Sequence, residues 1–345
     1  MTISGSIRQR DGQVAEVALA LRRVLAPAEL ALGVPLASLG RWRIGGPADI
    51  VVSPATPASL SAALTVIAAA GIRSVVIGDG SNVLFDDAGF RGVVVRIGRA
   101  FGGFTRGSDG VIEAGAGLWV PGFVRRVIAL GLSGATHAIG IPGTLGGLVA
   151  MNGGSQRRGI GEHVLSVDVV ARDGSYKRVE RSDLRFAYRT SALQFSDAVA
   201  VSARFRFPPG DRTALRREAI AILRTRRAKF PRVRANCGSV FVSDPELYAR
   251  IGPPGAAIER AGLKGVAIGG AQISPEHANF IVNTGRARSA DVLELIGVAR
   301  RGVEKLTGVA MAAEVRHLAA DGVLRPAHEV ADGSGVPRAP AELKL

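Results

Sequence analysis

The chain has 345 residues, of which 44 are Lys or Arg and 29 are Asp or Glu, so its formal net charge at pH 7 is +15. This length allows two or three compact domains with a sizeable core. Apolar residues make up 47% of the chain, which excludes a disordered protein and a charged coiled coil. The single cysteine, Cys237, excludes an internal disulfide framework and a zinc site built from cysteines.

The location and the partners of the protein are also constrained by composition. No apolar run approaches the roughly 20 residues that span a bilayer, and the first residues lack the apolar core of a secretory signal. We therefore expect a soluble cytoplasmic protein without membrane insertion. The positive charge suits nucleic acid, an anionic surface or small anionic ligands. Only 5% of residues are aromatic, so stacking platforms are scarce and we expect small anionic ligands and no nucleic acid.

The first elements are predicted from hydrophobic spacing and helix caps. Residues 1–13 are expected to form a flexible tail, and Val14–Leu32 has the spacing of a helix. A glycine-rich turn at Arg43–Pro47 leads into a short strand. The next helix is well marked, because Thr56 can cap it, Pro57 fits its first turn and Gly71 can close it.

Further elements follow from β-branched runs and turn residues. A hairpin is predicted around Asp173-Gly174, with strands at 163–172 and 175–180. A basic helix is predicted at 211–229, whose seven Lys and Arg residues most simply form a solvated face. We place a domain boundary at Pro208-Pro209-Gly210 and expect 319–345 to be a mobile polar tail. The other predicted elements are strands at 49–52, 74–77, 92–97, 111–114, 198–207, 239–242 and 280–283, a helix at 118–130, a long helix at 290–306, and shorter elements at 256–261 and 309–318.

Three glycine clusters are the main chemical feature of the sequence. They lie at Ile44–Pro47, Gly78–Asn82 and Gly140–Gly147, and the stretch Gly131–Ser155 holds eight glycines in 25 residues. None of them fits the Rossmann fingerprint or a P-loop. Each alone is most simply a tight turn. Together they offer rows of backbone N–H groups suited to a diphosphate, which favours an extended dinucleotide cofactor.

Metal and hydrolase chemistry find little support. The five histidines are scattered without paired spacing, so no metal site is expected. No Gly-x-Ser-x-Gly elbow follows a predicted strand, which disfavours a serine hydrolase.

Several blocks of sequence resemble the UDP-N-acetylenolpyruvoylglucosamine reductase family, between about residues 35 and 318. The order and spacing of so many separate blocks carry the resemblance. In the first half the blocks are Ile44–Asp49, Gly78–Leu84 and Gly140–Gly147 followed by Met151-Asn152. In the last third they are Gly238–Phe241, Ile258–Gly265, Ile268–Ser274 and His277–Asn283.

The resemblance implies a fold, a domain division and a reaction. The fold is α+β, with an FAD-binding domain of the vanillyl-alcohol-oxidase type and a smaller α+β substrate-binding domain. We expect the FAD-binding region at 14–209, with a core of about 43–208, and the substrate-binding domain at 210–318. The family reduces an enolpyruvyl ether with NADPH through FAD, in peptidoglycan precursor synthesis, and thereby serves cell-wall biogenesis, cell shape and cell division. The chain is similar to the compact subtype without an extra capping loop.

Three residues match the catalytic positions of the family. Arg189, in Phe186–Ser191, is implied as the clamp on the enolate, since a guanidinium stays charged and can fork onto a carboxylate. Ser239 is implied as the proton donor. Glu314 is implied as the second stabiliser, either protonated or held by Arg316 or Arg189. Taken singly, each could be an ordinary surface or strand residue.

The resemblance also implies binding residues. Substrate binding is assigned to Tyr188, Gln272, His277 and Asn279. Cofactor binding is assigned to Gly45, Gly46, Gly78, Gly80, Ser81, Asn82, Gly140, Pro142, Gly143, Thr144, Gly146, Gly147 and Asn152.

The chain departs from the family pattern at one informative place. The family commonly continues Gly-Ser-x-Phe with Lys-Asn-Pro, and this chain reads Val242-Ser243-Asp244-Pro245. Two alternatives therefore stand beside the main reading: a paralogue that reduces another unsaturated acid with the same FAD chemistry, and an FAD-binding protein without turnover. Neither NADPH over NADH nor an oligomeric state follows from the sequence. Cys237 is most simply a buried spectator thiol.

Overall fold

The computed structural model describes residues 3–333, which divide into two compact units. Within the described residues, unit 1 comprises 3–34, 47–80 and 90–229, and unit 2 comprises 35–46, 81–89 and 230–333. The main break therefore falls between Lys229 and Phe230, about twenty residues after the Pro208–Gly210 boundary that the sequence suggested. Two short segments, 35–46 and 81–89, belong to unit 2 although segments of unit 1 flank them in the sequence. Local sequence patterns do not reveal this exchange.

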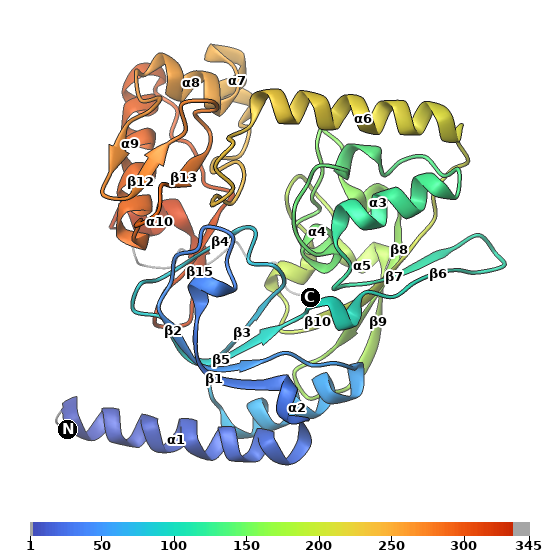
Figure 1. Cartoon of the computed structure of the whole chain (residues 1–345), viewed down its shortest axis with the longest axis vertical. Coiled ribbons are helices and arrows are strands. Elements are labelled where there is room, and N and C mark those ends of the chain that lie inside the picture. Colours follow the sequence, from blue (N-terminus) through green and yellow to red (C-terminus); the bar gives the residue numbers. More distant parts are fainter. Residues whose placement is uncertain (1–2, 334–345) are drawn as a thin grey trace. The chain divides into compact units, whose positions relative to one another are not determined.

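Unit 1 contains a four-stranded sheet in the order β1-β2-β5-β3. Its strands are β1 (Leu30–Pro35), β2 (Pro47–Val52), β3 (Ser74–Ile77) and β5 (Phe90–Arg96). Both β2 and β3 pair with β5 in parallel. Helices α1 (Ile3–Val24) and α2 (Pro57–Ala70) lie beside this sheet (Figure 1). Leu21, Leu60, Ile50 and Val93 meet there in a buried apolar cluster that fixes the helices on the sheet.

A five-stranded antiparallel sheet forms the other half of unit 1, in the order β6-β7-β10-β8-β9. Its strands are β6 (Phe104–Arg106), β7 (Ile112–Gly115), β8 (Val164–Val170), β9 (Tyr176–Glu180) and β10 (Val199–Phe205). The core below it includes Phe123 and Phe205, whose ring centroids lie 5.1 Å apart. The helices of this half are α3 (Val120–Ala129), α4 (Leu145–Ala150), α5 (Arg181–Leu184) and α6 (Arg212–Lys229), with 3-10 turns η3 (Arg99–Phe101), η4 (Thr136–Ala138), η5 (Ile160–Glu162) and η6 (Ala192–Phe195).

Unit 2 is built on two small three-stranded sheets and a long helix. One sheet has the order β11 (Ala267–Ile268), β12 (Ala271–Ile273) and β13 (Ile281–Asn283), and the other β15 (Leu324–Pro326), β14 (Arg316–Leu318) and β4 (Val83–Phe85). Helix α9 (Ser289–Thr307) packs on the first sheet through Val292, Leu295 and Ile296 (Figure 1). The other helices are α7 (Pro245–Ile251), α8 (Pro254–Arg260) and α10 (Ala327–Ala331), and η2 (Leu36–Ser38) is a 3-10 turn of this unit. A further 3-10 turn, η1 (Pro27–Glu29), belongs to unit 1.

Local predictions agree best where a cap or a turn residue marks the element. Thr56 accepts a hydrogen bond from the Ser59 N–H, and Gly71 closes α2 with φ +61°, as predicted. The Asp173-Gly174 turn joins β8 to β9 in the predicted hairpin. The basic helix 211–229 is α6, and only Leu215, Ala219 and Ile222 of it are buried, so most of its basic residues face solvent.

Four predictions are wrong in detail. Residues 3–13 belong to helix α1 and are not a loose tail, and α1 ends at Val24 instead of Leu32. Part of the expected mobile tail is ordered, because β15 pairs with β14 and α10 follows it. The rest of that tail, 334–345, lies outside the described residues. The expected strand at 239–242 is reduced to one bridge, Phe241 to Ala313.

Across residues 3–333, none of the helices combines the length and the apolar character needed to cross a bilayer.

Candidate active site

Gly78, the first residue of the second glycine cluster, meets the third cluster within unit 1. Strand β3 ends at Ile77, and Gly78 follows it directly. A Cβ on Gly78 would lie 2.2 Å from the Oγ1 atom of Thr144, the residue that precedes α4. Only glycine allows this approach, so the loop after β3 lies directly against the Thr144 side chain of the Gly140–Gly147 segment.

Backbone hydrogen bonds join the third cluster to residues 116–120, at the start of α3. The N–H of Val120 donates to Gly143 O (3.0 Å), and the N–H of Leu145 donates to Leu118 O (2.8 Å). Gly146 donates to Ala116 O (2.7 Å), and a Cβ on Gly146 would come within 2.9 Å of the Ala116 Cβ. These bonds fix the backbone of the cluster before any ligand binds.

Gly147 differs from its neighbours because its side-chain position is open. A Cβ there would meet only the Thr144 Oγ1, at 3.5 Å, and the residue is exposed. Gly140 is covered instead, since a Cβ there would lie 2.4 Å from the Nε of Arg226 in α6. Burial lowers the pKa of that guanidinium to about 10. One residue of the basic helix therefore packs over the glycine-rich segment.

Arg96 is a residue that the sequence reasoning missed. It ends β5 and pairs in register with Ile77, the residue before Gly78. Its Nε is buried without a hydrogen-bond partner among the described residues. A buried guanidinium N–H without a partner suits an anion. Only the strand register indicates this position, because Arg96 and Gly78 are far apart in sequence.

Gly45 and Gly46 of the first glycine cluster lie in unit 2. Close packing against neighbouring residues explains why both positions are glycine. Gly45 has φ +129°, and a Cβ there would lie 2.6 Å from the Cβ of Phe85. A Cβ on Gly46 would lie 2.2 Å from Asp87 O, and the Gly46 N–H donates to Asp86 O (2.9 Å). Cofactor binding by these two glycines stays a prediction, and the Gly46 N–H is already occupied within the unit.

Arg189 lies at the tip of a two-residue turn in unit 1. Ala187 and Thr190 exchange both backbone hydrogen bonds, which leaves Tyr188 and Arg189 at the apex, with Arg189 at φ +57°. The guanidinium donates from Nη2 to Gly154 O (2.8 Å) and lies 5.3 Å from the centroid of the Tyr188 ring. The turn therefore presents two predicted site residues together.

The end of α4 holds this turn in place. Asn152 donates from Nδ2 to Ala187 O (2.8 Å) and accepts the Gly161 N–H at Oδ1 (2.9 Å). Ser191 and Gln194 both donate to Ala150 O. The predicted clamp Arg189 is thus tied to the chain just after the third glycine cluster. The side chain of Asn152, predicted as a cofactor ligand, is used to position the turn.

Ser239 and Glu314 are brought to adjacent chain segments in unit 2. The N–H of Glu314 donates to the carbonyl of Val240, the residue after Ser239 (2.8 Å). Phe241 and Ala313 form a bridge one step further on. Asn82, from the second glycine cluster, donates from Nδ2 to Glu314 O (3.0 Å). Two predicted catalytic residues and one predicted cofactor ligand therefore lie together, although the sequence separates them by up to 232 residues.

Asn279, predicted to bind substrate, is buried and hydrogen-bonded to the protein backbone. It is 6% exposed, accepts the Phe241 N–H at Oδ1 (2.9 Å) and donates to Phe241 O from Nδ2 (3.0 Å). Gln272 donates to Gly265 O (3.0 Å), and the His277 ring lies edge-on to Phe280. Contact of these side chains with substrate stays a prediction, and Asn279 also fixes the backbone of Phe241, two residues after Ser239.

The segment that departs from the family pattern starts a helix. Asp244 accepts the Leu247 N–H (2.9 Å) and caps α7. Its carboxylate stands near the place where the family commonly has lysine and asparagine. Cys237 is buried, its Sγ lies 3.6 Å from Val83 O, and burial raises the pKa of the thiol to about 12. This supports a spectator thiol.

Within residues 3–333, no group of His, Cys, Asp and Glu side chains is arranged to hold a metal ion. The residues present do fit a dinucleotide. Gly78 and Gly147 carry no side chain, the side-chain position of Gly147 is open apart from the Thr144 hydroxyl, and the buried Arg96 Nε lies at the end of β5. These features suit the diphosphate of FAD.

Comparison with known proteins assigns a class to this arrangement. Residues 47–180 match the family model described as an FAD binding domain. Residues 230–318 match the model of the C-terminal domain of UDP-N-acetylenolpyruvoylglucosamine reductase. The two models follow the break at Phe230. The chain is an FAD-dependent oxidoreductase with a separate C-terminal domain.

Individual relatives identify the family. The chain is 47% identical over 300 residues to UDP-N-acetylenolpyruvoylglucosamine reductase 1 of Corynebacterium glutamicum, covering 87% of this chain and 89% of that protein. It is 42% identical to the reductase of Heliobacterium modesticaldum over 82% of this chain and 88% of that protein. The crystal structure of the enzyme from Thermus caldophilus matches with a TM-score of 0.69 at 30% identity, over 82% of this chain and 97% of that one. This chain belongs to the UDP-N-acetylenolpyruvoylglucosamine reductase family.

Proposed function

We propose that this protein reduces UDP-N-acetylglucosamine enolpyruvate to UDP-N-acetylmuramate, with NADPH as the reductant and in the cytoplasm. The observation that supports the proposal is the hydrogen bond from the Glu314 N–H to Val240 O, which joins the chain segments of two predicted catalytic residues, Ser239 and Glu314. The 47% identity over 87% of the chain supports the same substrate class.

When bound, FAD supplies the redox chemistry, a two-electron exchange between NADPH and the enol ether. Reduction of the double bond at its β-carbon leaves negative charge on the α-carbon and the adjacent carboxylate. The guanidinium of Arg189 can fork onto that carboxylate with two parallel hydrogen bonds. The bond to Gly154 O and the Tyr188 ring orient the guanidinium for this role.

Ser239 completes the reduction by donating its hydroxyl proton to the α-carbon. A hydroxyl is a weak acid, but a carbanion-like centre is a strong base, so the transfer is feasible once the two are held together. The bonds from Asn279 to Phe241 and from Glu314 to Val240 hold the segment that carries Ser239. Glu314 acts as a hydrogen-bond donor in its protonated form or as an orienting carboxylate.

A second candidate function is the reduction of another unsaturated acid. One observation favours it: Asp244 caps α7 near the place where the family commonly has Lys-Asn. A carboxylate there repels a diphosphate, which weakens the handle for a nucleotide sugar.

An anaerobic titration separates the two functions. NADPH should bleach the yellow holoenzyme, and UDP-N-acetylglucosamine enolpyruvate should then restore the oxidised flavin spectrum. Bleaching without recovery would favour the second candidate. A colourless protein that does not take up added FAD would contradict both.

A further inference from the structure

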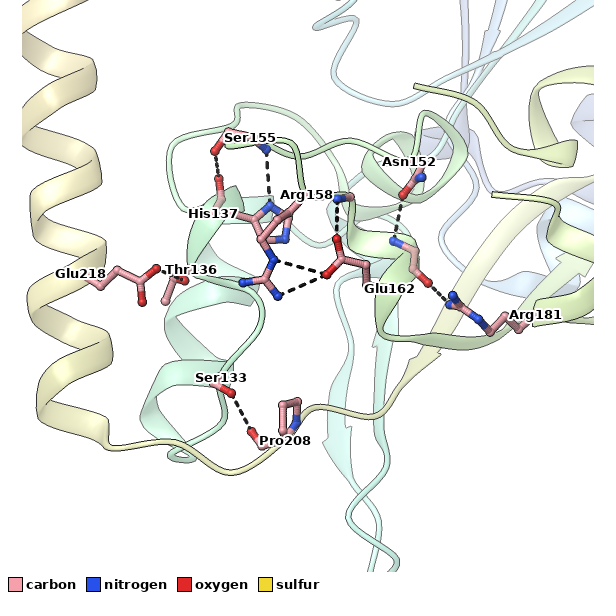
Figure 2. Close-up of polar contacts among 12 residues, drawn as sticks. Ser133, Thr136, His137, Asn152, Ser155, Arg158, Glu162, Arg181, Pro208 and Glu218 are labelled. Carbon is pink, nitrogen blue, oxygen red and sulfur yellow. Dashed lines mark hydrogen bonds and ion pairs between the residues drawn. The ribbon is translucent and has the colours of Figure 1, made fainter. Parts of the chain in front are cut away.

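The buried His137 is tied to a loop that the proposed mechanism uses. His137 lies in η4 and is 1% exposed. Its Nδ1 accepts the N–H of Ser155 (3.4 Å), and its carbonyl accepts the Ser155 Oγ–H (2.5 Å), as Figure 2 shows. Its Nε2 is buried and has no hydrogen-bond partner among the described residues. One histidine therefore holds the backbone N–H and the hydroxyl of Ser155.

The residue before Ser155 anchors the catalytic arginine. Gly154 O accepts the hydrogen bond from Arg189 Nη2 (2.8 Å). Gly154 is packed closely, since a Cβ there would lie 3.0 Å from the His137 Cε1 and 1.9 Å from Arg158 O. The path from the His137 ring to the Arg189 guanidinium thus runs through only two residues of backbone.

η4 itself is held from α6. The Thr136 Oγ1 donates to the Glu218 carboxylate over 2.7 Å, and Figure 2 shows this bond between the turn and the long helix. Glu218 is the single acidic residue in the sequence 212–229. α6 therefore supports the turn that presents His137, in addition to its solvated basic face.

The ring of His137 must stay neutral to make its bond. The accepting Nδ1 places the ring proton on Nε2. Burial lowers the pKa of His137 to about 4, with Arg158, His163 and Arg189 adding to this effect and Glu162 opposing it. Glu162 in turn accepts hydrogen bonds from the Arg158 guanidinium and from the Gly159 N–H (Figure 2). A second proton on the ring would remove the acceptor for Ser155 and add a cation near Arg189.

We propose that His137 is a positioning residue for Arg189, acting through Ser155 and the Gly154 carbonyl. The inference rests on the proposed function, in which Arg189 clamps the substrate carboxylate. The alternative is a histidine that only fills the core of unit 1, and the two make different predictions.

The first measurement does not depend on the substrate. Hydrogen exchange of the holoenzyme, followed by mass spectrometry, reports the opening of the Gly153–Ser155 loop. We expect His137→Leu to raise exchange there at least tenfold and His137→Asn, whose amide oxygen can take the place of Nδ1, to raise it much less. His163→Leu is the matched control, since it removes a neighbouring half-buried histidine whose Nε2 has no hydrogen-bond partner among the described residues. Unchanged exchange in His137→Leu would overturn the proposal.

The second measurement asks whether the effect passes through Arg189. In anaerobic rapid mixing, His137→Leu should slow reoxidation of the reduced flavin by the enolpyruvyl substrate by roughly 10- to 100-fold, the scale for a misplaced catalytic group. Reduction of the flavin by NADPH should be unchanged. In an Arg189→Ala background the same substitution should cost nothing further. An equal loss in both backgrounds would assign His137 a purely structural role and overturn the proposal.

A second variant and the wild-type flavin titration distinguish failure of this proposal from failure of the proposed function. Ser155→Ala removes only the bond to the His137 carbonyl, so it tests the link if His137→Leu does not fold. We expect an intermediate rise in exchange for it, and no rise would count against the proposal. If the wild-type flavin is bleached by NADPH but not reoxidised by the enolpyruvyl sugar, the proposed function fails, and the exchange data still decide the role of His137.

Discussion

The backbone N–H of Glu314 donates a hydrogen bond to the carbonyl oxygen of Val240 (2.8 Å), next to Ser239. This bond joins two segments about 75 residues apart, and Asn82 adds a third by donating to the Glu314 carbonyl. The positions of the Ser239 and Glu314 backbones are therefore coupled. A change at one residue affects the geometry of the other, so the effects of substitutions at Ser239 and Glu314 on activity are not expected to be additive.

Ser239→Ala should separate the two half-reactions. Without the hydroxyl proton donor, turnover of the enolpyruvyl substrate should fall by at least roughly 10²-fold, the usual scale for a general acid. Reduction of the flavin by NADPH should survive. Anaerobic rapid mixing measures both steps, with Ser175→Ala in the β8–β9 hairpin as the control. Near-normal turnover in Ser239→Ala would show that another group delivers the proton.

Asn279→Leu should destabilise unit 2 and also slow catalysis. The change removes both hydrogen bonds between the Asn279 side chain and the Phe241 backbone. The buried N–H and C=O of Phe241 then lose these partners. The cost for such groups is about 1–3 kcal/mol each. Urea unfolding measures the loss, and Gln272→Ala, which removes one bond of a half-buried side chain, should cost less. A variant of normal stability with only a raised KM would restrict Asn279 to substrate binding.

Gly78→Ala should impair retention of FAD. The added methyl would lie 2.2 Å from the Thr144 Oγ1, so the loop after β3 and the Gly140–Gly147 segment must move apart. The flavin absorbance per protein after gel filtration measures retention. Gly98→Ala is the matched control, because a Cβ there has nothing within 4 Å and its φ is −105°. Equal flavin content in the two variants would contradict the role of this contact.

The stability of unit 1 should fall as the pH drops from about 6.5 to 4. The pKa of His137 is about 4 in the folded state against 6.5 for the unfolded chain, so in this window the unfolded state binds more protons. Stability then rises with pH, and the full effect of this lowered pKa is about 3 kcal/mol. Urea unfolding at pH 7 and pH 4.5 measures it. His137→Asn should flatten this dependence by a similar amount, and an unchanged slope would argue against a buried neutral ring.

Cys237 should resist alkylation in the native protein. Its pKa of about 12 leaves almost no thiolate at neutral pH, and the side chain is buried. Iodoacetamide should label it only after denaturation, as mass spectrometry can follow. Rapid native labelling that abolishes activity would contradict a spectator role.

Local sequence patterns predicted those elements whose hydrogen bonds close within a few residues. The Thr56 cap, the Gly71 stop and the Asp173-Gly174 hairpin are of this kind, and all three are confirmed. Patterns failed where pairing is distant in sequence. Leu324–Ala331 reads as a polar tail, but pairing with β14 orders it, and β14 also recruits β4 from 83–85.

By itself, the sequence determined the family, the glycine clusters and the identity of the catalytic candidates, because residue types and their order along the chain carry that information. Only the tertiary structure decided how the side chains are used. It pairs Asn279 with Phe241 and connects His137 to Arg189 through Ser155 and Gly154. It also sets Arg96, whose Nε has no partner in the part of the chain that the structure describes, opposite Ile77, the residue before Gly78. The physical reason is that hydrogen-bond partners and burial depend on segments that meet only when the chain folds.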